Sequence, residues 1–183
     1  MTAPDPLDPL VDAYPPFGLR ISHGNMTLRV FRDADLPEYL DLLSGPVFAD
    51  EDADWVFPWY ESPLPERRRN AVQAHWGWRA SFRPEDWTLA FGVYVGGVLV
   101  GCQDVLAEDF AKRRVVHSGS WLALEHQGKG WGVWMRKLML HFAFDLSCRS
   151  LVTQDFLDYC CGVGGYVGLG GDGLTGDLDG DLA

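Results

Sequence analysis

The sequence predicts one α/β domain built around a mixed, mostly antiparallel sheet. Segments rich in β-formers flank helical segments, a Gly-Gly turn joins two of these strands, and a glycine-rich turn connects a strand to an amphipathic helix. The chain has 183 residues, 47% of them hydrophobic and 13% aromatic, so it can bury a sizeable core. The order of its elements lacks the regular alternation of a doubly wound nucleotide-binding fold.

The first part of the chain is expected to contain a leader, two strands and two helices. Five prolines in residues 1–17 predict an extended, poorly ordered leader. Asp35 followed by Glu38 predicts a helix N-terminus with Asp35 as its cap. The expected elements are strands at 19–21 and 26–31 and helices at 36–43 and 65–82.

The second part is expected to contain a hairpin, a central strand and a strand–helix–strand unit. Gly96-Gly97 predicts the hairpin turn. Three consecutive strands favour antiparallel pairing, whereas the final strand–helix–strand unit favours a parallel crossover. The expected elements are strands at 87–95, 98–106, 115–124 and 151–153 and a helix at 133–145.

The glycine-rich turn between the central strand and the last helix indicates an anion site. Its sequence is Gln127-Gly128-Lys129-Gly130-Trp131-Gly132. Unpaired backbone N–H groups and the helix dipole favour an anion at such a helix start, and glycines let the anion approach the backbone. The alternative is a purely structural connection. A nucleoside-triphosphate P-loop is excluded because no Gly-Lys-Ser/Thr ending follows, and a dinucleotide fingerprint fails on glycine spacing.

The bulk composition narrows the class of partner and the compartment. A formal net charge of −11 argues against nucleic acid, which needs a basic face, and is compatible with a cationic partner such as an amine. No segment is apolar enough to span a membrane and no signal peptide is evident, so a cytoplasmic protein is expected. No metal is expected, because the cysteines and histidines lack metal-site spacing: Cys102, Cys148, Cys160 and Cys161, and His75, His117, His126 and His141.

The element order and the glycine turn together resemble the GNAT superfamily of acyl-CoA-dependent N-acetyltransferases. The signature of that superfamily is Gln or Arg, two residues, Gly, one residue, then Gly or Ala, and Gln127, Gly130 and Gly132 fill the fixed places. The match is closer to the branch of ribosomal-protein serine and alanine N-terminal acetyltransferases. The supporting segments are 28–36, the hairpin through Val100-Gly101, 118–122 and Phe142-Ala143-Phe144, and the resemblance covers about residues 19–158.

This resemblance implies a GNAT-like fold with a V-shaped splay between two parallel strands, 115–124 and 151–154. It implies acetyl-CoA as co-substrate, with the backbone from Gln127 to Gly132 holding the pyrophosphate and groups near Trp121 to Leu124 pairing with the pantetheine arm and the acetyl carbonyl. The expected reaction is direct attack by a primary amine, on a peptide N-terminus or a small molecule. The implied cofactor-binding residues are Trp121, Leu122, Ala123, Leu124, Gln127, Gly128, Lys129, Gly130, Trp131 and Gly132.

Several polar residues are candidates for the proton transfers that such a reaction needs. An amine of pKa ~10 is mostly protonated at neutral pH, so a base is required. The candidate bases are Asp104, Glu108 and the acids of segment 51–54. Ser118 and Ser120 alternate on the central strand and would line the acceptor slot or position water. Tyr159 is the candidate acid for the leaving thiolate. The aromatic group Trp55, Phe57, Trp59, Trp76 and Trp78 is interpreted as packing, with a wall of the acceptor pocket as the alternative.

The C-terminal end departs from the pattern of the family. The chain divides into a leader (1–17), an acetyltransferase domain (18–159) and a tail (160–183), and residues 162–183 hold nine glycines and four aspartates without Lys or Arg. The tail is open to three interpretations: an altered reading frame, a divergent terminus, or a segment ordered by a partner chain. Loss of the closing strands would expose a strand edge that favours pairing with a second copy. The alternative function is therefore a catalytically impaired relative that binds acyl-CoA or a protein partner.

Overall fold

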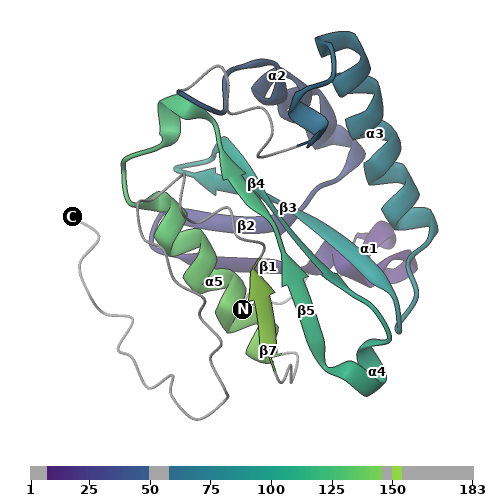
Figure 1. Ribbon diagram of the computed structural model, residues 1–183. Helices are drawn as coiled ribbons and strands as arrows, with labels where there is room; N and C mark the ends of the chain where they lie inside the picture. The colour runs from purple at the N-terminus through teal and green to yellow at the C-terminus, as the bar shows by residue number, and fades with distance from the viewer. Residues whose placement is uncertain (1–7, 50–57, 146–149, 154–183) are drawn as a thin grey trace.

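The protein is organised around one seven-stranded mixed sheet (Figure 1). The computed structural model describes residues 8–49, 58–145 and 150–153. The strands are β1 (Arg20–His23), β2 (Met26–Val30), β3 (Trp87–Val95), β4 (Val98–Ala107), β5 (Val115–Ser118), β6 (Ser120–Leu122) and β7 (Ser150–Thr153). They confirm the predicted strands to within a few residues, except that the expected strand 115–124 is divided at Gly119 into β5 and β6.

The sheet has the order β1-β2-β3-β4-β5-β7, with β6 pairing β4. All neighbouring strands are antiparallel except β5 and β7, which pair in parallel from Val115–Ser150 to Ser118–Thr153. The predicted antiparallel hairpin and parallel crossover are both confirmed. The crossover helix is α5 (Trp131–Asp145), so the glycine turn lies between β6 and this helix.

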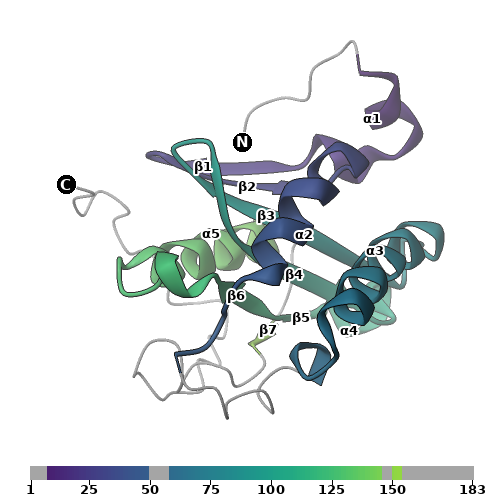
Figure 2. The same ribbon diagram turned by 90° about the horizontal axis from the view of Figure 1, so that it is seen from above.

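Helices cover both faces of the sheet (Figure 2), and a hydrophobic cluster lies on each face. One cluster joins strand residues such as Phe91 and Val116 to α5 through Met135 and Phe142. The other joins Trp121 and further strand residues to the helices on the opposite face. The helices are α1 (Pro9–Ala13), α2 (Leu36–Ser44), α3 (Leu64–Ala80), α4 (Phe110–Arg113) and α5, with short 3-10 turns η1 (Pro15–Gly18), η2 (Asp33–Asp35), η4 (Pro58–Tyr60) and η5 (Leu124–His126). None of the described helices has both the length and the apolar character needed to cross a bilayer.

Strand β4 contains a β-bulge in its pairing with β3, next to the point where it approaches β6. Val93 pairs with Gly101 and Tyr94 with Leu99, so Val100 is the extra residue. A Cβ at Gly101 would lie 2.2 Å from the carbonyl oxygen of Trp121, so only glycine lets β6 approach β4 this closely. The position of Trp121 therefore depends on a glycine in the neighbouring strand.

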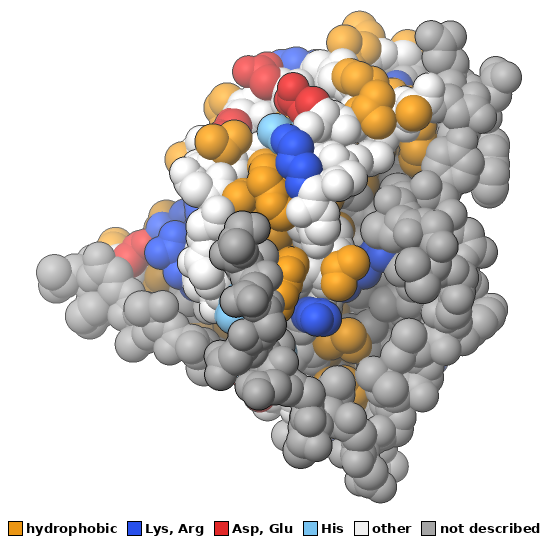
Figure 3. Space-filling view, turned by 90° about the vertical axis from the view of Figure 1, so that its left-hand side faces the viewer, with side chains coloured by type: hydrophobic (Ala, Val, Ile, Leu, Met, Phe, Trp, Pro, Cys, Tyr) orange, Lys and Arg blue, Asp and Glu red, His pale blue; other side chains and the backbone are white. Residues whose placement is uncertain are grey.

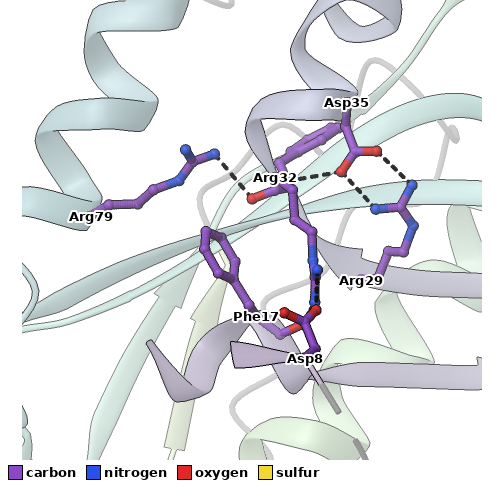
Figure 4. Close-up of polar contacts among 7 residues, drawn as sticks. Asp8, Phe17, Arg29, Arg32, Asp35 and Arg79 are labelled. Carbon is purple, nitrogen blue, oxygen red and sulfur yellow. Dashed lines mark hydrogen bonds and ion pairs between the residues drawn. The ribbon is translucent and has the colours of Figure 1, made fainter. Parts of the chain in front are cut away.

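The N-terminal segment differs from the extended leader that its prolines predict. Residues 9–18 form α1 and η1, and Asp8 caps α1 by accepting a hydrogen bond from the N–H of Leu10 at 2.9 Å. Asp8 also pairs with Arg32, which lies beside the ring of Phe17 (Figure 4). Proline fits the first helical position because it has no N–H to lose there, so prolines spaced in this way start helices as readily as they prevent them.

Asp35 is the N-cap residue of α2, as predicted, but its side chain gives no capping support to this helix because it makes no hydrogen bond to the N–H groups of α2. Its carboxylate instead accepts a bidentate pair of hydrogen bonds from Arg29, at 2.6 and 2.7 Å, and one from the N–H of Arg32 at 2.8 Å (Figure 4). The 3-10 turn η2 precedes α2 directly, so Asp35 already has helical backbone angles and its side chain points back toward β2. The arginines attract this carboxylate more strongly than the N–H groups of α2.

Candidate active site

The turn before α5 presents a row of free backbone donors. Gly128 and Gly130 have φ of +72° and +78°, a conformation that glycine adopts without strain. Within the described part of the chain, the N–H groups of residues 128–132 donate to no other protein group. The N–H of Gln127 is already bonded to the carbonyl of Leu124 at 3.1 Å. Five successive amides at the N-terminus of a 15-residue helix form a strong site for an anion.

The side chain of Gln127 holds this turn in place. Its Nε2 donates to the carbonyl oxygen of Val47 at 2.7 Å and to that of Leu122 at 2.8 Å. These bonds tie the turn to the end of β6 and to the segment after α2. The glutamine thus positions the amides through its side chain, a role that the sequence pattern did not predict.

Two lysines lie on the turn and on the helix that follows it. Lys129 lies over the ring of Trp131, with Nζ 4.8 Å from the ring centroid, and Lys137 lies over Trp134 at 4.6 Å. The first turn of α5 carries no acidic residue. Figure 3 looks onto the side of the molecule where this turn lies in Figure 1, and shows Lys and Arg side chains beside a band of hydrophobic ones. The environment therefore favours an anion with an apolar arm.

A cavity of about 220 Å³ adjoins the turn. Its lining residues are Ser120, Trp121, Leu122, Gln127, Gly128, Gly130, Gly132, Val133, Met135 and Arg136. Arg136 projects from α5 into this region, and its Nε donates to Oγ of Ser120 at 3.3 Å. The cavity thus reaches from the free amides to the middle of β6.

A second cavity, of about 360 Å³, lies between the sheet and the helices α2 and α3. It is lined by Tyr39, Leu43, Trp59, Arg67, Asn70, Ala71, Ala74, His75, Trp78, Ala90, Cys102, Asp104, Gly119, Ser120 and Trp121. Ser120 and Trp121 line both cavities, so the two spaces border the same strand, β6.

Asp104 is the single carboxylate among the described residues that line the second cavity. Its Oδ1 accepts a hydrogen bond from the N–H of Gly119 at 2.6 Å, and no Lys or Arg in the described part of the chain pairs with it. Burial raises the pKa of this carboxyl, and the Gly119 N–H opposes the rise. A Cβ at Gly119 would lie 3.0 Å from Asp104 Oδ1, so a larger residue here would push against this carboxylate.

No protein-family model matches the chain. Among solved structures, one match is a Vibrio cholerae protein assigned as a ribosomal-protein-serine acetyltransferase, with a TM-score of 0.56, 16% identity, and coverage of 78% of this chain and 79% of that chain. A second is a Salmonella typhimurium acetyl transferase that modifies the N-terminal serine of a 50S ribosomal subunit protein, with a TM-score of 0.52, 16% identity and 74% coverage of each chain. A third is a microcin self-immunity acetyltransferase in complex with acetyl-CoA and AMP, with a TM-score of 0.52, 14% identity and coverage of 72% and 69%.

The chain has the GNAT acetyltransferase fold. The fold that the sequence resemblance implied is therefore confirmed. The parallel pair that borders the expected splay of this fold is β5 with β7. Residue 154, the last of the expected splay, lies outside the described residues.

The GNAT signature residues lie together, but the neighbouring strand is less free than expected. Gln127, Gly128, Gly130 and Gly132 line the first cavity with Trp121 and Leu122. The N–H groups of Ala123 and Leu124, which were expected near the pantetheine arm, already donate to the carbonyls of Val100 and Pro46, each at 3.0 Å. Lys129 and Trp131 lie on the turn without lining this cavity.

The candidate catalytic residues lie in different parts of the molecule. Ser120 lines both cavities, whereas Ser118 lines neither and is buried, donating to the carbonyl oxygen of Asp104 at 2.6 Å. Glu108 is exposed, pairs with Arg113 at 3.2 Å and lines neither cavity. Tyr159 and the acids of segment 51–54 lie outside the described residues.

The second cavity also contains residues that sequence reasoning missed. Trp59 and Trp78 of the aromatic group line it, whereas Trp76 is exposed and donates to Asp33 at 3.2 Å. Trp55 and Phe57 lie outside the described residues. The main omission is one face of α3, whose lining residues are Arg67, Asn70, Ala71, Ala74, His75 and Trp78. Their spacing of three and four residues is the helical signal that could have identified this face.

Proposed function

We propose that this chain is an N-acetyltransferase that transfers the acetyl group of acetyl-CoA to a primary amine. The observation that carries the proposal is that Ser120 and Trp121 of β6 border two cavities, one with the free amides of the glycine turn and one with the carboxylate of Asp104. Proteins of the same fold give support, since one forms a complex with coenzyme A and another with acetyl-CoA.

The first cavity would hold the pyrophosphate of coenzyme A and the adjoining part of its pantetheine arm. The amides of residues 128–132 would hold the pyrophosphate, and Lys129 and Arg136 would add positive charge. The space beside Gly128 and Gly130 is open, since a Cβ at either would have no neighbour within 4 Å. When bound, acetyl-CoA would supply an activated thioester as the acetyl donor.

The second cavity would receive the amine and take up its proton. The nitrogen would lie near Asp104, whose carboxylate would accept a proton so that the nitrogen lone pair becomes available for direct attack on the acetyl carbonyl. The N–H of Gly119 holds this carboxylate in one orientation. Ser120, held by Arg136, would face the reacting groups.

The leaving thiolate needs little help, because a thiol of pKa ~8.5 is a good leaving group near neutral pH. Tyr159 remains our proposed donor of the proton that the thiolate finally takes. The proposed acceptor is a primary amine, either on a peptide N-terminus or on a small molecule. We also propose that the protein is cytoplasmic, acts without a metal and forms a homodimer.

A glycine substitution with a matched control tests the proposal. Gly130 and Gly97 both have positive φ, +78° and +86°, and both have open space where a Cβ would be. An alanine there costs about 1–2 kcal/mol of backbone strain. In the free Gly130→Ala variant the turn would relax out of positive φ and would have to regain it when acetyl-CoA binds, so the affinity measured by calorimetry should fall by about 5- to 30-fold, since 1.4 kcal/mol corresponds to tenfold. Gly97→Ala, in the distant β3–β4 turn, should leave the affinity unchanged.

Thiol release in the presence of amines tests the transfer itself. The proposal predicts acetyl-CoA binding and amine-dependent release of coenzyme A. Binding without turnover would favour an acyl-CoA-binding or protein-interaction module. No binding at all would overturn both functions.

A further inference from the structure

The wall of the second cavity is a continuous series of aromatic rings. Trp59 contacts Trp121 with ring centroids 5.6 Å apart, and Trp121 contacts Tyr39 at 6.2 Å. Tyr39 contacts His75 at 5.0 Å, and His75 contacts Trp78 at 5.2 Å. All five line the cavity, and burial keeps His75 neutral by lowering its pKa to about 4. A ligand in this cavity would therefore contact the faces and edges of aromatic rings on several sides.

Small residues leave room between these rings. Ala71 and Ala74 face the cavity from α3, and Ala90 and Gly119 face it from the sheet. The resulting volume of about 360 Å³ falls in the range of small-ligand sites, about 300–1,000 Å³. A ring-sized group fits this space, whereas a methyl-sized one would leave much of the apolar wall in contact with water.

Among the described residues, the lining of the cavity offers a carboxylate to one ammonium group. Asp104 can neutralise a single cation, and no second carboxylate is present among the described lining residues. Arg67 is held by Tyr60, with its guanidinium carbon 4.1 Å from the ring centroid and a hydrogen bond to the Tyr60 carbonyl. No carboxylate among the described residues pairs with Arg67, whereas the other arginines of α3 each have one: Arg68 with Asp41, Arg69 with Glu66 and Arg79 with Asp33. The charge of Arg67 therefore opposes a second cation.

From these three features we infer that the acceptor is a primary monoamine with an apolar, aromatic body, not a polyamine or a polar peptide N-terminus. This inference rests on the proposed acetyl transfer. The ammonium group lies near Asp104 before it gives up its proton, and the body fills the space between Trp59, Trp78 and the alanines of α3. Burial of the ring and its contacts with the aromatic wall supply the selectivity.

A panel of amines at saturating acetyl-CoA tests the inference. The probes are 2-phenylethylamine, ethylamine, spermidine and a tetrapeptide beginning with serine. We expect kcat/KM for 2-phenylethylamine to exceed that for each of the others by at least about tenfold, because a hydrophobic pocket gains about that factor or more from each added methylene.

Ala74→Leu provides a second, independent measurement. The larger side chain would fill the space for the ring, so kcat/KM for 2-phenylethylamine should fall by at least about tenfold and that for ethylamine by less than about threefold. Ala80→Leu makes the same change on an exposed position of the same helix and should alter neither value. Calorimetry with acetyl-CoA checks that each variant still folds and binds.

The possible outcomes separate this inference from the proposed function. Preference for 2-phenylethylamine, lost selectively in Ala74→Leu, supports it. Preference for spermidine or the peptide overturns the inference while acetyl transfer stands. Equal loss for both amines in Ala74→Leu overturns the assignment of this cavity to the ring. Acetyl-CoA binding without acetylation of any amine overturns the inference together with the proposed transfer.

Discussion

Replacement of Asp104 by asparagine should abolish most activity and stabilise the protein. The substitution preserves the size of the side chain and an oxygen that can accept the Gly119 N–H, which now lies 2.6 Å from Oδ1. It removes the ability to take up a proton. Loss of a positioned general base slows a reaction by about 10²- to 10⁴-fold, which corresponds to about 3–5 kcal/mol in the activation free energy.

The stability effect follows from the raised pKa of Asp104. In the folded protein this carboxyl binds its proton more tightly than in the unfolded chain, where its pKa is near 3.8. The unfolding free energy therefore falls as pH rises from about 3.8 through the higher folded pKa, and the ionised carboxylate destabilises the protein at pH 7. Asp104→Asn removes this penalty, so we expect the melting temperature of the variant at pH 7 to exceed that of the wild type.

The assay combines amine acetylation across pH with thermal unfolding. The wild-type kcat/KM should rise with pH through the pKa of Asp104, and Asp104→Asn should lose this limb. Asp109→Asn is the matched control, because Asp109 is a surface carboxylate at φ +47°, where asparagine is well tolerated. If Asp104→Asn keeps kcat/KM within about threefold, Asp104 is not the base. If its melting temperature falls, the carboxylate is a structural requirement of the Gly119 turn.

Two further substitutions, His75→Phe and Gly101→Ala, test the fold, and Gly77→Ala is the control for the second. The pKa of His75 is about 4 in the folded protein and about 6.5 in the unfolded chain, so the unfolding free energy should fall by about 3 kcal/mol as pH falls from 6.5 toward 4. In urea unfolding, the variant His75→Phe should not show this fall. A variant with the same pH dependence as the wild type would contradict the assignment. Gly101→Ala should cost about 3 kcal/mol in thermal unfolding, because its Cβ would collide with the carbonyl of Trp121 in β6. Gly77→Ala, in α3 with no atom within 4 Å of the new Cβ, should instead gain up to about 1 kcal/mol, and equal effects would refute the steric account.

Local patterns were sufficient to predict most of the fold. The hairpin around Gly96-Gly97 and the helix after the glycine turn follow from nearest-neighbour chemistry, in which β-formers alternate and glycine supplies positive φ. The N-terminal helix was missed because proline restricts φ in the same way at a helix start as in an extended chain. The capping bond from Asp8 to the N–H of Leu10 separates the two cases, and composition does not reveal it.

The candidate site was predicted on the cofactor side and largely missed on the acceptor side. The amides of the turn are consecutive, so one short motif reveals them. From the sequence, Asp104 and Glu108 are equally good candidates for the base, because both are acids of the same predicted strand region. Only the contact of Asp104 with the N–H of Gly119 distinguishes the enclosed carboxylate from the exposed Glu108. The cavity wall combines residues from α2, α3 and three strands, and no local pattern brings such distant residues together.

The most direct test of the account is the response of the backbone amides to coenzyme A. A ¹H–¹⁵N correlation spectrum of the labelled protein should show its largest shifts for residues 128–132 when coenzyme A is added. The amides of Gly96 and Gly97 in the β3–β4 turn should not move. Shifts of these five amides on addition of coenzyme A would support the predicted donor site. A spectrum in which these five signals stay unchanged while the ligand is present in excess would contradict the central claim that the glycine turn binds an acyl-CoA.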